Sequence, residues 1–184
     1  MLKHTLTALT VIIALPTYAD DFSCTKSVGA RTIDGNVIVP SNRTCTLTGT
    51  YVKGNVEVKD NAKVLVRQGA TVIGNIQSEG GAQIRVRDSE VDGDVQLTGV
   101  DSSLESLVVN SRIGGTVDWK DNSTPFLIRF TQVNSDVKVN QNAGLARIFD
   151  NVIDGNLQCQ SNEPAPRGAR NRVGGNKEDQ CRRF

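Results

Sequence analysis

Apolar and polar residues alternate in short runs along most of the chain, and turn-forming residues separate the runs. Residues 56–58 (Val-Glu-Val) and 117–119 (Val-Asp-Trp) are examples. Alternation with a period of two is typical of strands that bury one face. A second short run lies several residues further on, as in 64–66 and 126–128, and a third, very short one, such as 70–72, leads to the next turn. The pattern predicts an all-β chain.

One phrase, typified by Val52-Lys53-Gly54-Asn55-Val56, recurs eight times. Its third position is occupied by Gly35, Gly54, Gly74, Gly93, Gly115, Ser135, Gly155 and Gly175. The successive steps are 19, 20, 19, 22, 20, 20 and 20 residues. A repeat of this length with three short strands is typical of one coil of a β-solenoid. Because parallel crossover connections are right-handed by default, we predict a right-handed parallel β-helix of about eight coils.

The glycine of each phrase is expected to form a tight corner between two strands. Glycine takes a positive φ at no steric cost, and a following Asn or Asp tolerates the left-handed region. The residues that follow the glycine column are Asn36, Asn55, Asn75, Asp94, Thr116, Asp136, Asn156 and Asn176. Stacked coils are expected to join their side chains in a ladder, each amide bonded to its neighbours above and below. We interpret this column as a structural spine rather than a site.

Residues 1–19 have the pattern of a cleaved secretory signal. A positive start at Lys3 and His4 precedes an apolar run over 6–15 and a small residue, Ala19. We therefore expect a signal peptide at 1–19, a β-helix at 20–160 and a C-terminal cap at 161–184. The protein is expected to be exported, periplasmic or extracellular, with no transmembrane segment after signal cleavage.

Charge and composition exclude several classes of function. The 21 basic side chains are balanced by 20 acidic ones, so no basic excess is present to bind nucleic acid. The one histidine, His4, lies in the predicted signal. A mature chain without histidine cannot use Ser-His or Cys-His catalysis or an imidazole-bound metal. We expect no cofactor and no metal.

The four cysteines fall near the two ends of the repeat. Cys24 and Cys45 are 21 residues apart, and Cys159 and Cys181 are 22 apart, so each pair is separated by about one coil. An even number of cysteines in an exported chain indicates disulfides. Stacking places each pair on neighbouring coils, which predicts the bridges Cys24–Cys45 and Cys159–Cys181. The ligands are too widely spaced for a zinc site.

Five arginines fall at outward positions on or beside the second strand of successive coils. They are Arg67, Arg85, Arg87, Arg129 and Arg147. At the rung spacing of about 4.8 Å they are expected to form a basic stripe suited to an anionic glycan. The alternative is that they are solvated strand residues that keep sheets from pairing side by side.

Apolar residues share this predicted face. Leu107, Val109, Leu127 and Phe149 occupy outward phases in the central coils, whereas Trp119 occupies an inward phase and is expected to fill the core. Exposed apolar residues in one patch indicate a partner or self-association, unless a loop covers them.

An enzyme that acts on polysaccharides is the alternative function. Its candidate residues are carboxylates, namely Asp92, Asp94, Asp118, Asp136, Asp150 and Asp154. Two carboxylates that converge within about 5 to 9 Å can divide acid and base roles. However, most of these residues lie in the corner phrase, where Asn and Asp alternate freely, and coil lengths leave no long inserted loop to build a cleft.

Two stretches of the sequence resemble known proteins. The phrase at 54–58, followed by 62–66 and 70–76, resembles the repeats of bactofilins, polymer-forming bacterial scaffold proteins, although bactofilins lack the signal and the cysteines. Residues 155–159 and 173–181 look like the closing segment of small exported bacterial proteins without an assigned activity. The second resemblance implies a bacterial, exported, disulfide-capped β-helix and no mechanism.

From the sequence we therefore expect an exported, non-catalytic β-solenoid that binds or scaffolds a partner, either an anionic glycan or an envelope protein. A polysaccharide lyase or glycoside hydrolase is the alternative. A self-assembling rod is a third possibility, but two disulfide-capped ends favour a particle of finite length.

Overall fold

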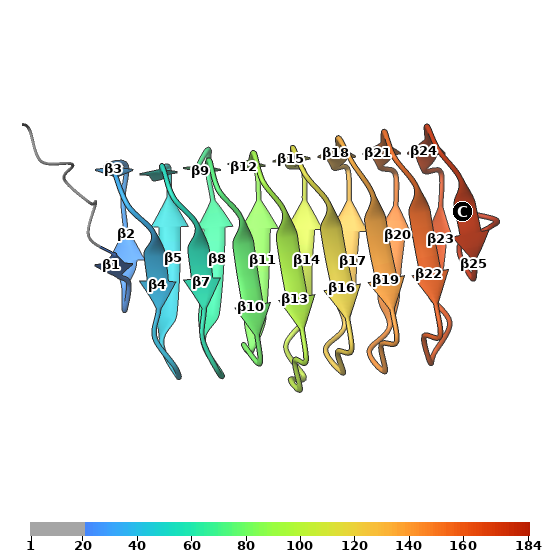
Figure 1. Cartoon of the computed structure of the whole chain (residues 1–184), viewed down its shortest axis with the longest axis horizontal. Helices are drawn as coiled ribbons and strands as arrows, with labels where there is room; N and C mark the ends of the chain where they lie inside the picture. Colours follow the sequence, from blue (N-terminus) through green and yellow to red (C-terminus); the bar gives the residue numbers. More distant parts are fainter. Residues whose placement is uncertain (1–20) are drawn as a thin grey trace, which may run out of the picture.

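The computed structural model describes residues 21–184 and shows a parallel β-solenoid (Figure 1). The predicted signal, 1–19, lies outside the described residues. Sheet A consists of β1 (Phe22–Ser23), β4 (Val37–Val39), β7 (Val56–Val58), β10 (Ile76–Glu79), β13 (Val95–Thr98), β16 (Val117–Lys120), β19 (Val137–Asn140), β22 (Leu157–Gln160) and β25 (Lys177–Asp179). Sheet B consists of β2 (Ser27–Val28), β5 (Thr44–Thr48), β8 (Lys63–Arg67), β11 (Gln83–Arg87), β14 (Ser106–Val109), β17 (Phe126–Arg129), β20 (Ala146–Phe149) and β23 (Arg167–Ala169). Sheet C consists of β3 (Thr32–Ile33), β6 (Tyr51–Val52), β9 (Thr71–Val72), β12 (Glu90–Val91), β15 (Arg112–Ile113), β18 (Gln132–Val133), β21 (Val152–Ile153) and β24 (Arg172–Val173).

Each coil contributes one strand to each sheet, and each strand pairs in parallel with its equivalents in the neighbouring coils. Coil 1 contains β1 to β3, coil 8 contains β22 to β24, and β25 begins a further coil. In Figure 1 the coils follow one another along the horizontal axis. The prediction of a parallel β-solenoid with about eight coils of about 20 residues is confirmed. Right-handed winding stays a prediction from the crossover rule.

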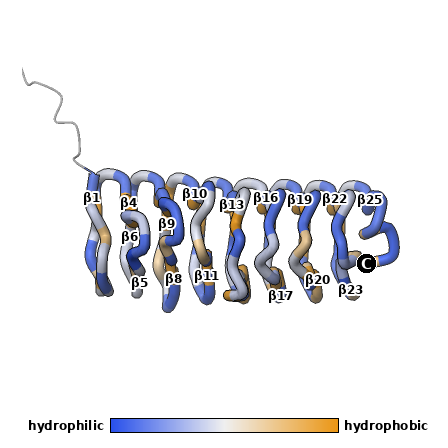
Figure 2. Tube along the Cα trace, turned by 90° about the horizontal axis from the view of Figure 1, so that it is seen from below, coloured by the Kyte–Doolittle hydropathy of each residue, from blue (hydrophilic) through white to orange (hydrophobic). Residues whose placement is uncertain are grey.

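The core is a column of aliphatic side chains enclosed by the three sheets. In β7 the side chains of Val56 and Val58 are buried while Glu57 between them is partly exposed, as the alternation predicts. Trp119 is fully buried, and its ring stacks on Phe126 with centroids 4.0 Å apart, so its predicted core position is confirmed. Hydrophilic and hydrophobic stretches alternate along every coil (Figure 2).

The glycine corners lie between sheets C and A, and their backbone differs from the prediction. No glycine of this column, and no residue that follows one, has a positive φ. Positive values occur instead at the other two corners, for example at Asn61 (56°) and Asp88 (50°). Glycine is required here because coils approach closely: a Cβ on Gly54 would lie 2.7 Å from the carbonyl oxygen of Gly35 and 2.5 Å from Oδ1 of Asn36.

The predicted ladder at this corner exists, but its main donors are backbone amides. Oδ1 of Asn36 accepts the N–H of Asn55 at 2.8 Å, and Oδ1 of Asn55 accepts the N–H of Asn75 at 2.8 Å. The amide-to-oxygen contact between the side chains of Asn55 and Asn36 is longer, at 3.4 Å. We call this column the exterior ladder. Because only an acceptor oxygen is needed, Asp94 and Asp136 replace Asn without breaking it.

One coil shows how the glycine and the ladder depend on each other. Ser135 replaces glycine, and in the coil before it Thr116 replaces Asn. The two hydroxyl groups are 3.1 Å apart and hydrogen-bonded. Threonine has no Oδ1 that would clash with a Cβ at the glycine position of the next coil. Thr116 therefore makes room for the side chain of Ser135.

We predict that Gly54→Ala destabilises the fold by about 1–3 kcal/mol, because the new Cβ overlaps the preceding coil. Gly29→Ala is the matched control, since no heavy atom lies within 4 Å of its Cβ position and its φ is not positive. The double variant Asn36→Thr, Gly54→Ser copies Thr116 and Ser135 and should be more stable than Gly54→Ser alone. Urea unfolding measures these differences. Equal stability of Gly54→Ala and Gly29→Ala would refute the close-approach account.

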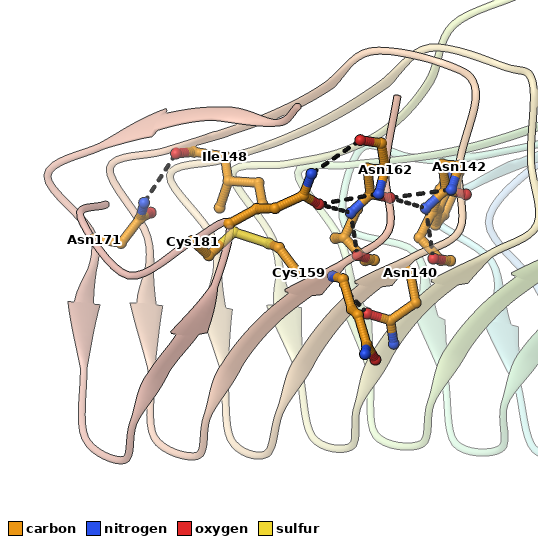
Figure 3. The surroundings of a disulfide bond; sticks show 11 residues. Asn140, Asn142, Ile148, Cys159, Asn162, Asn171 and Cys181 are labelled. Atoms are coloured by element: carbon orange, nitrogen blue, oxygen red, sulfur yellow. Dashed lines mark hydrogen bonds between the residues drawn. A yellow bond between two sulfur atoms is a disulfide. The ribbon is translucent and has the colours of Figure 1, made fainter. Parts of the chain in front are cut away.

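A second column of asparagines lies inside the corner between sheets A and B, and the sequence analysis missed it. Asn122, Asn142 and Asn162 are buried (Figure 3 shows Asn142 and Asn162). Oδ1 of Asn142 accepts the N–H of Asn122 at 3.0 Å, and its Nδ2 donates to the carbonyl oxygen of Trp119 at 2.9 Å. Gln180 ends the column by accepting from Asn162. Here each amide uses both donor and acceptor, so the ladder needs asparagine.

Asn151 and Asn171 repeat this arrangement at the corner between sheets B and C. Oδ1 of Asn151 accepts the N–H of Thr131 at 3.0 Å, and Nδ2 of Asn171 donates to the carbonyl oxygen of Ile148 at 2.9 Å. Both side chains are buried. We call the two buried columns the interior ladders.

We predict that Asn142→Asp destabilises the protein by about 3–5 kcal/mol at pH 7, because a buried carboxylate would face two acceptor oxygens. Burial raises the pKa of such a carboxyl above its unfolded value, so the loss should shrink as the pH falls through that raised pKa. Asn55→Asp, in the exterior ladder, should change stability by less than about 1 kcal/mol. Thermal unfolding at pH 7 and pH 4 tests this contrast; similar losses for both variants would contradict it.

The two predicted disulfides are confirmed. Cys24 bridges to Cys45 between coils 1 and 2, with Cα atoms 5.4 Å apart, and Cys159 bridges to Cys181 at the other end, with Cα atoms 5.3 Å apart (Figure 3). All four cysteines are buried. Each bridge closes about one coil, which in the chain-entropy account contributes about 3 kcal/mol.

The segment assigned to a C-terminal cap, 161–184, contributes β23, β24 and β25 and then a closing turn. Phe184 packs against the core and lies directly over Gly168, where a Cβ would meet its ring. The Lys177 ammonium donates to the carbonyl oxygens of Asn171 and Phe184. This end of the rod is therefore covered by an aromatic ring and a disulfide.

Candidate functional site

The outer face of sheet B carries the predicted arginines in two neighbouring columns. The strand register aligns Leu65, Arg85, Leu107, Leu127, Arg147 and Arg167 in one column. It aligns Thr48, Arg67, Arg87, Val109, Arg129, Phe149 and Ala169 in the other. The five predicted arginines therefore do not form one unbroken stripe, because coil 5 has Leu107 and Val109 at both outward positions.

Arg67, Arg85 and Arg87 form the amino-terminal half of this face, which we call the arginine triad. Arg67 and Arg87 are register partners, so their Cα atoms are about 4.8 Å apart, and Arg85 lies two residues from Arg87 on the same face, about 6.6 Å away. Within residues 21–184, none of the three has a carboxylate within 4.0 Å. Arg67 donates from Nε to Oγ1 of Thr48 at 3.3 Å. The triad is an uncompensated cluster of positive charge.

Three arginines of the carboxyl-terminal half are paired with two carboxylates. Asp150 accepts from Nε of Arg129 at 3.1 Å and from Nε of Arg170 at 2.5 Å. The hydrogen bond from Arg170, with that from Arg129 added, holds the pKa of the Asp150 carboxyl below its usual value. Arg147 pairs with Glu105, which comes from coil 5. Three guanidinium groups thus share two carboxylates, and Arg167 in the first column has no carboxylate within 4.0 Å among residues 21–184, so this half keeps a net positive charge that is partly compensated.

The apolar residues predicted on this face are more covered than expected. Leu107 is only 3% exposed although it belongs to the outer face, and Val109, Leu127 and Phe149 are partly buried. The pair between Glu105 and Arg147 joins coils 5 and 7, and Leu127 of coil 6 stands between Leu107 and Arg147 in their column. The ion pair between Glu105 and Arg147 thus extends across the coil that carries Leu127, and the apolar side chains do not form one open patch.

A hollow of about 310 Å³ remains in the carboxyl-terminal half. It is lined by Leu127, Arg129, Arg147, Phe149 and Arg170. Two apolar side chains and three guanidinium groups therefore meet at one place. Four of these residues are predicted from the sequence; Arg170, which lies at the corner after β23, is not.

Phe130, at the corner after β17, was also missed. Its side chain is 53% exposed, and its φ is 52°, in the left-handed region. The Arg129 guanidinium lies 4.3 Å from the centroid of its ring. The equivalent residues of the other coils, Gly49, Gln68, Asp88, Asn110, Asp150 and Arg170, all have positive φ. Phe130 is the one aromatic residue in this column, which is a signal in the repeat that an aligned comparison of coils would have found.

The carboxylates of the enzyme alternative lie at two corners and on sheet A. Asp94 and Asp136 belong to the exterior ladder, Asp150 binds two arginines, and Asp92 and Asp154 are exposed in the glycine corners. Asp118 lies on the outer face of sheet A. Desolvation by burial raises the pKa of its carboxyl, Lys138 and Lys120 lower it, and the charge of Asp94 raises it further. Asp94 and Asp118 are therefore near enough to interact, and the enzyme alternative stays a prediction.

A wider, open groove of about 910 Å³ crosses sheet A. Its acidic residues are Glu57, Asp60 and Glu79, and none of the six predicted aspartates lines it. Lys59 pairs with Glu57 at 2.6 Å. Within residues 21–184, no three His, Cys, Asp or Glu side chains gather to hold a metal ion, and no helix is long and apolar enough to cross a membrane.

These observations define the protein as a parallel β-solenoid of about eight coils, stapled by a disulfide near each end. Comparison of the chain with protein-family models, with curated proteins and with solved structures finds no match. The parallel β-solenoid is therefore shown, and no family is identified.

Proposed function

We propose that the protein is an exported, non-catalytic binding module whose sheet B face binds an anionic glycan. The observation that carries this proposal is the arginine triad, three guanidinium groups on a flat, rigid sheet with no carboxylate partner among the described residues. Guanidinium forms charge-assisted, bidentate hydrogen bonds with carboxylate and with phosphate or sulfate oxygens.

The coils of the solenoid place guanidinium groups at a regular spacing. Arg67 and Arg87 lie on consecutive rungs about 4.8 Å apart, so a polymer with regularly spaced anionic groups can meet more than one guanidinium at a time. The main chain of β8 and β11 fixes these positions, which lowers the ordering cost of binding. A protein partner is the alternative occupant, and it would be favoured if the wild type were not retained by the glycan in the experiment below.

Export is supported by the disulfides. Two buried bridges, Cys24–Cys45 and Cys159–Cys181, are consistent with an oxidising location outside the cytoplasm. Acidic glycans occur in such locations, so the proposed ligand and the proposed compartment agree.

We predict that the triple variant Arg67→Gln, Arg85→Gln, Arg87→Gln weakens binding of sodium polygalacturonate about tenfold or more at low ionic strength, because the uncompensated charge is removed. The matched control removes three basic side chains exposed on the sheet C side, Lys53→Gln, Arg112→Gln and Arg172→Gln, and should bind as the wild type does. Affinity electrophoresis measures retention. No retention of the wild type, or equal loss in both triple variants, would overturn the proposal.

A further inference from the structure

The carboxyl-terminal half of the sheet B face is built differently from the arginine triad. Three of its guanidinium groups share two carboxylates, so its positive charge is partly compensated, and the side chains of Leu127 and Phe149 help to line its hollow. A surface that served only to attract a polyanion would not need an apolar lining. The arrangement is suited to a ligand that presents both an anionic group and an apolar face.

The hollow is small. At about 310 Å³ it lies at the lower end of the range for small-molecule sites, roughly 300–1,000 Å³. It can hold one ring-sized group, while a longer chain would have to continue along the face towards the triad. A pyranose ring of an acidic sugar combines a C–H face for apolar contact with a carboxylate for a guanidinium.

Arg129 is held ready for an anion at the edge of this hollow. Its guanidinium lies over the Phe130 ring and its Nε donates to Asp150. These contacts fix the plane of the group and leave its two Nη atoms without an acceptor among the described residues. A guanidinium that is oriented before binding loses less conformational entropy when a carboxylate arrives.

The backbone of Phe130 indicates that this arrangement is maintained at a cost. An aromatic residue with φ of 52° is strained by about 1 kcal/mol or more, and a side chain that is 53% exposed recovers little of it through burial. Asn110 fills the equivalent place in the preceding coil without an aromatic ring. Gln68 and Arg170 also have positive φ at this corner, so the left-handed backbone belongs to the fold, and what distinguishes Phe130 is an exposed aromatic ring that contacts the Arg129 guanidinium.

We infer that the hollow is a subsite for one hexuronate residue of the glycan, with its carboxylate bound by Arg129 and Arg147 and its C–H face on Leu127 and Phe149. Phe130 is a positioning residue that orients Arg129. This inference rests on the proposed function, because it assumes that the sheet B face binds a glycan, and it adds which sugar class the face selects.

The test compares two short anions, trigalacturonate and tripolyphosphate, by titration followed in NMR spectra. Tripolyphosphate has charge but no apolar face, so it can bind guanidinium groups of both halves without using Leu127 and Phe149. Arg129→Gln and Phe130→Asn should each weaken trigalacturonate binding about fivefold to tenfold. Because both variants leave the triad unchanged, tripolyphosphate binding should weaken by no more than about twofold. Val152→Asn, which removes another exposed apolar side chain on sheet C, is the control and should change neither.

Phe130→Asn has a second readout that a merely structural role would not give. Because asparagine tolerates a positive φ, the variant should unfold at a higher temperature than the wild type while binding trigalacturonate more weakly. Raised stability with unchanged trigalacturonate binding would overturn the inference. So would self-association of the wild type that Phe130→Asn abolishes while trigalacturonate binding stays unchanged.

The outcomes separate this inference from the proposed function. If the wild type binds neither anion, the proposed glycan face is wrong and the subsite is wrong with it. If the wild type binds trigalacturonate and only the triad variant weakens it, the proposed function stands and the subsite is overturned.

Discussion

Vertical registry between coils is the constraint on which the rest of the structure depends. Every strand of the solenoid bonds to the strand one coil away, so a distance of about 20 residues along the chain becomes a direct neighbour in space. The cysteine bridges, the asparagine ladders and the arginine columns are all consequences of this one relation. A coil of a different length must therefore accommodate its extra residues at a corner, as coil 5 does between β13 and β14.

The corners set the register through side-chain oxygens as well as main-chain bonds. In the exterior ladder an oxygen such as Oδ1 of Asn55 accepts one N–H from the next coil, and this leaves the second side-chain atom free to be nitrogen or oxygen. In the interior ladders Asn142 uses both atoms in a buried place, which restricts the residue to asparagine. Asparagine can therefore be replaced by aspartate in the exterior ladder but not in the interior ladders. The difference follows from the burial of the side chain and from the number of hydrogen bonds that it makes.

The sequence contained much of the architecture, because the architecture is a repeat. The spacing of Gly54 and its equivalents gave the coils, and the positions of Cys159 and Cys181 gave their bridge without further information. The prediction of a positive φ at Gly54 was wrong. Both a positive φ and a close approach of two coils favour glycine, so the sequence alone does not distinguish these two reasons. The sequence predicted which strands carry the arginines, but it did not predict how these arginines are arranged in columns and paired. The contact between Glu105 and Arg147, for example, depends on the three-dimensional register of the coils. Phe130 was missed because it breaks the repeat instead of following it.

The central claim, that corner residues one repeat apart are hydrogen-bonded neighbours, can be measured directly in solution. Couplings across hydrogen bonds, detected by NMR between a backbone amide nitrogen and a side-chain carbonyl carbon, report each donor and its acceptor. The account predicts couplings from the amides of Asn55, Asn75 and Asn176 to the side chains of Asn36, Asn55 and Asn156. Couplings that join other residues, or none for these amides, would contradict the stacking of the coils.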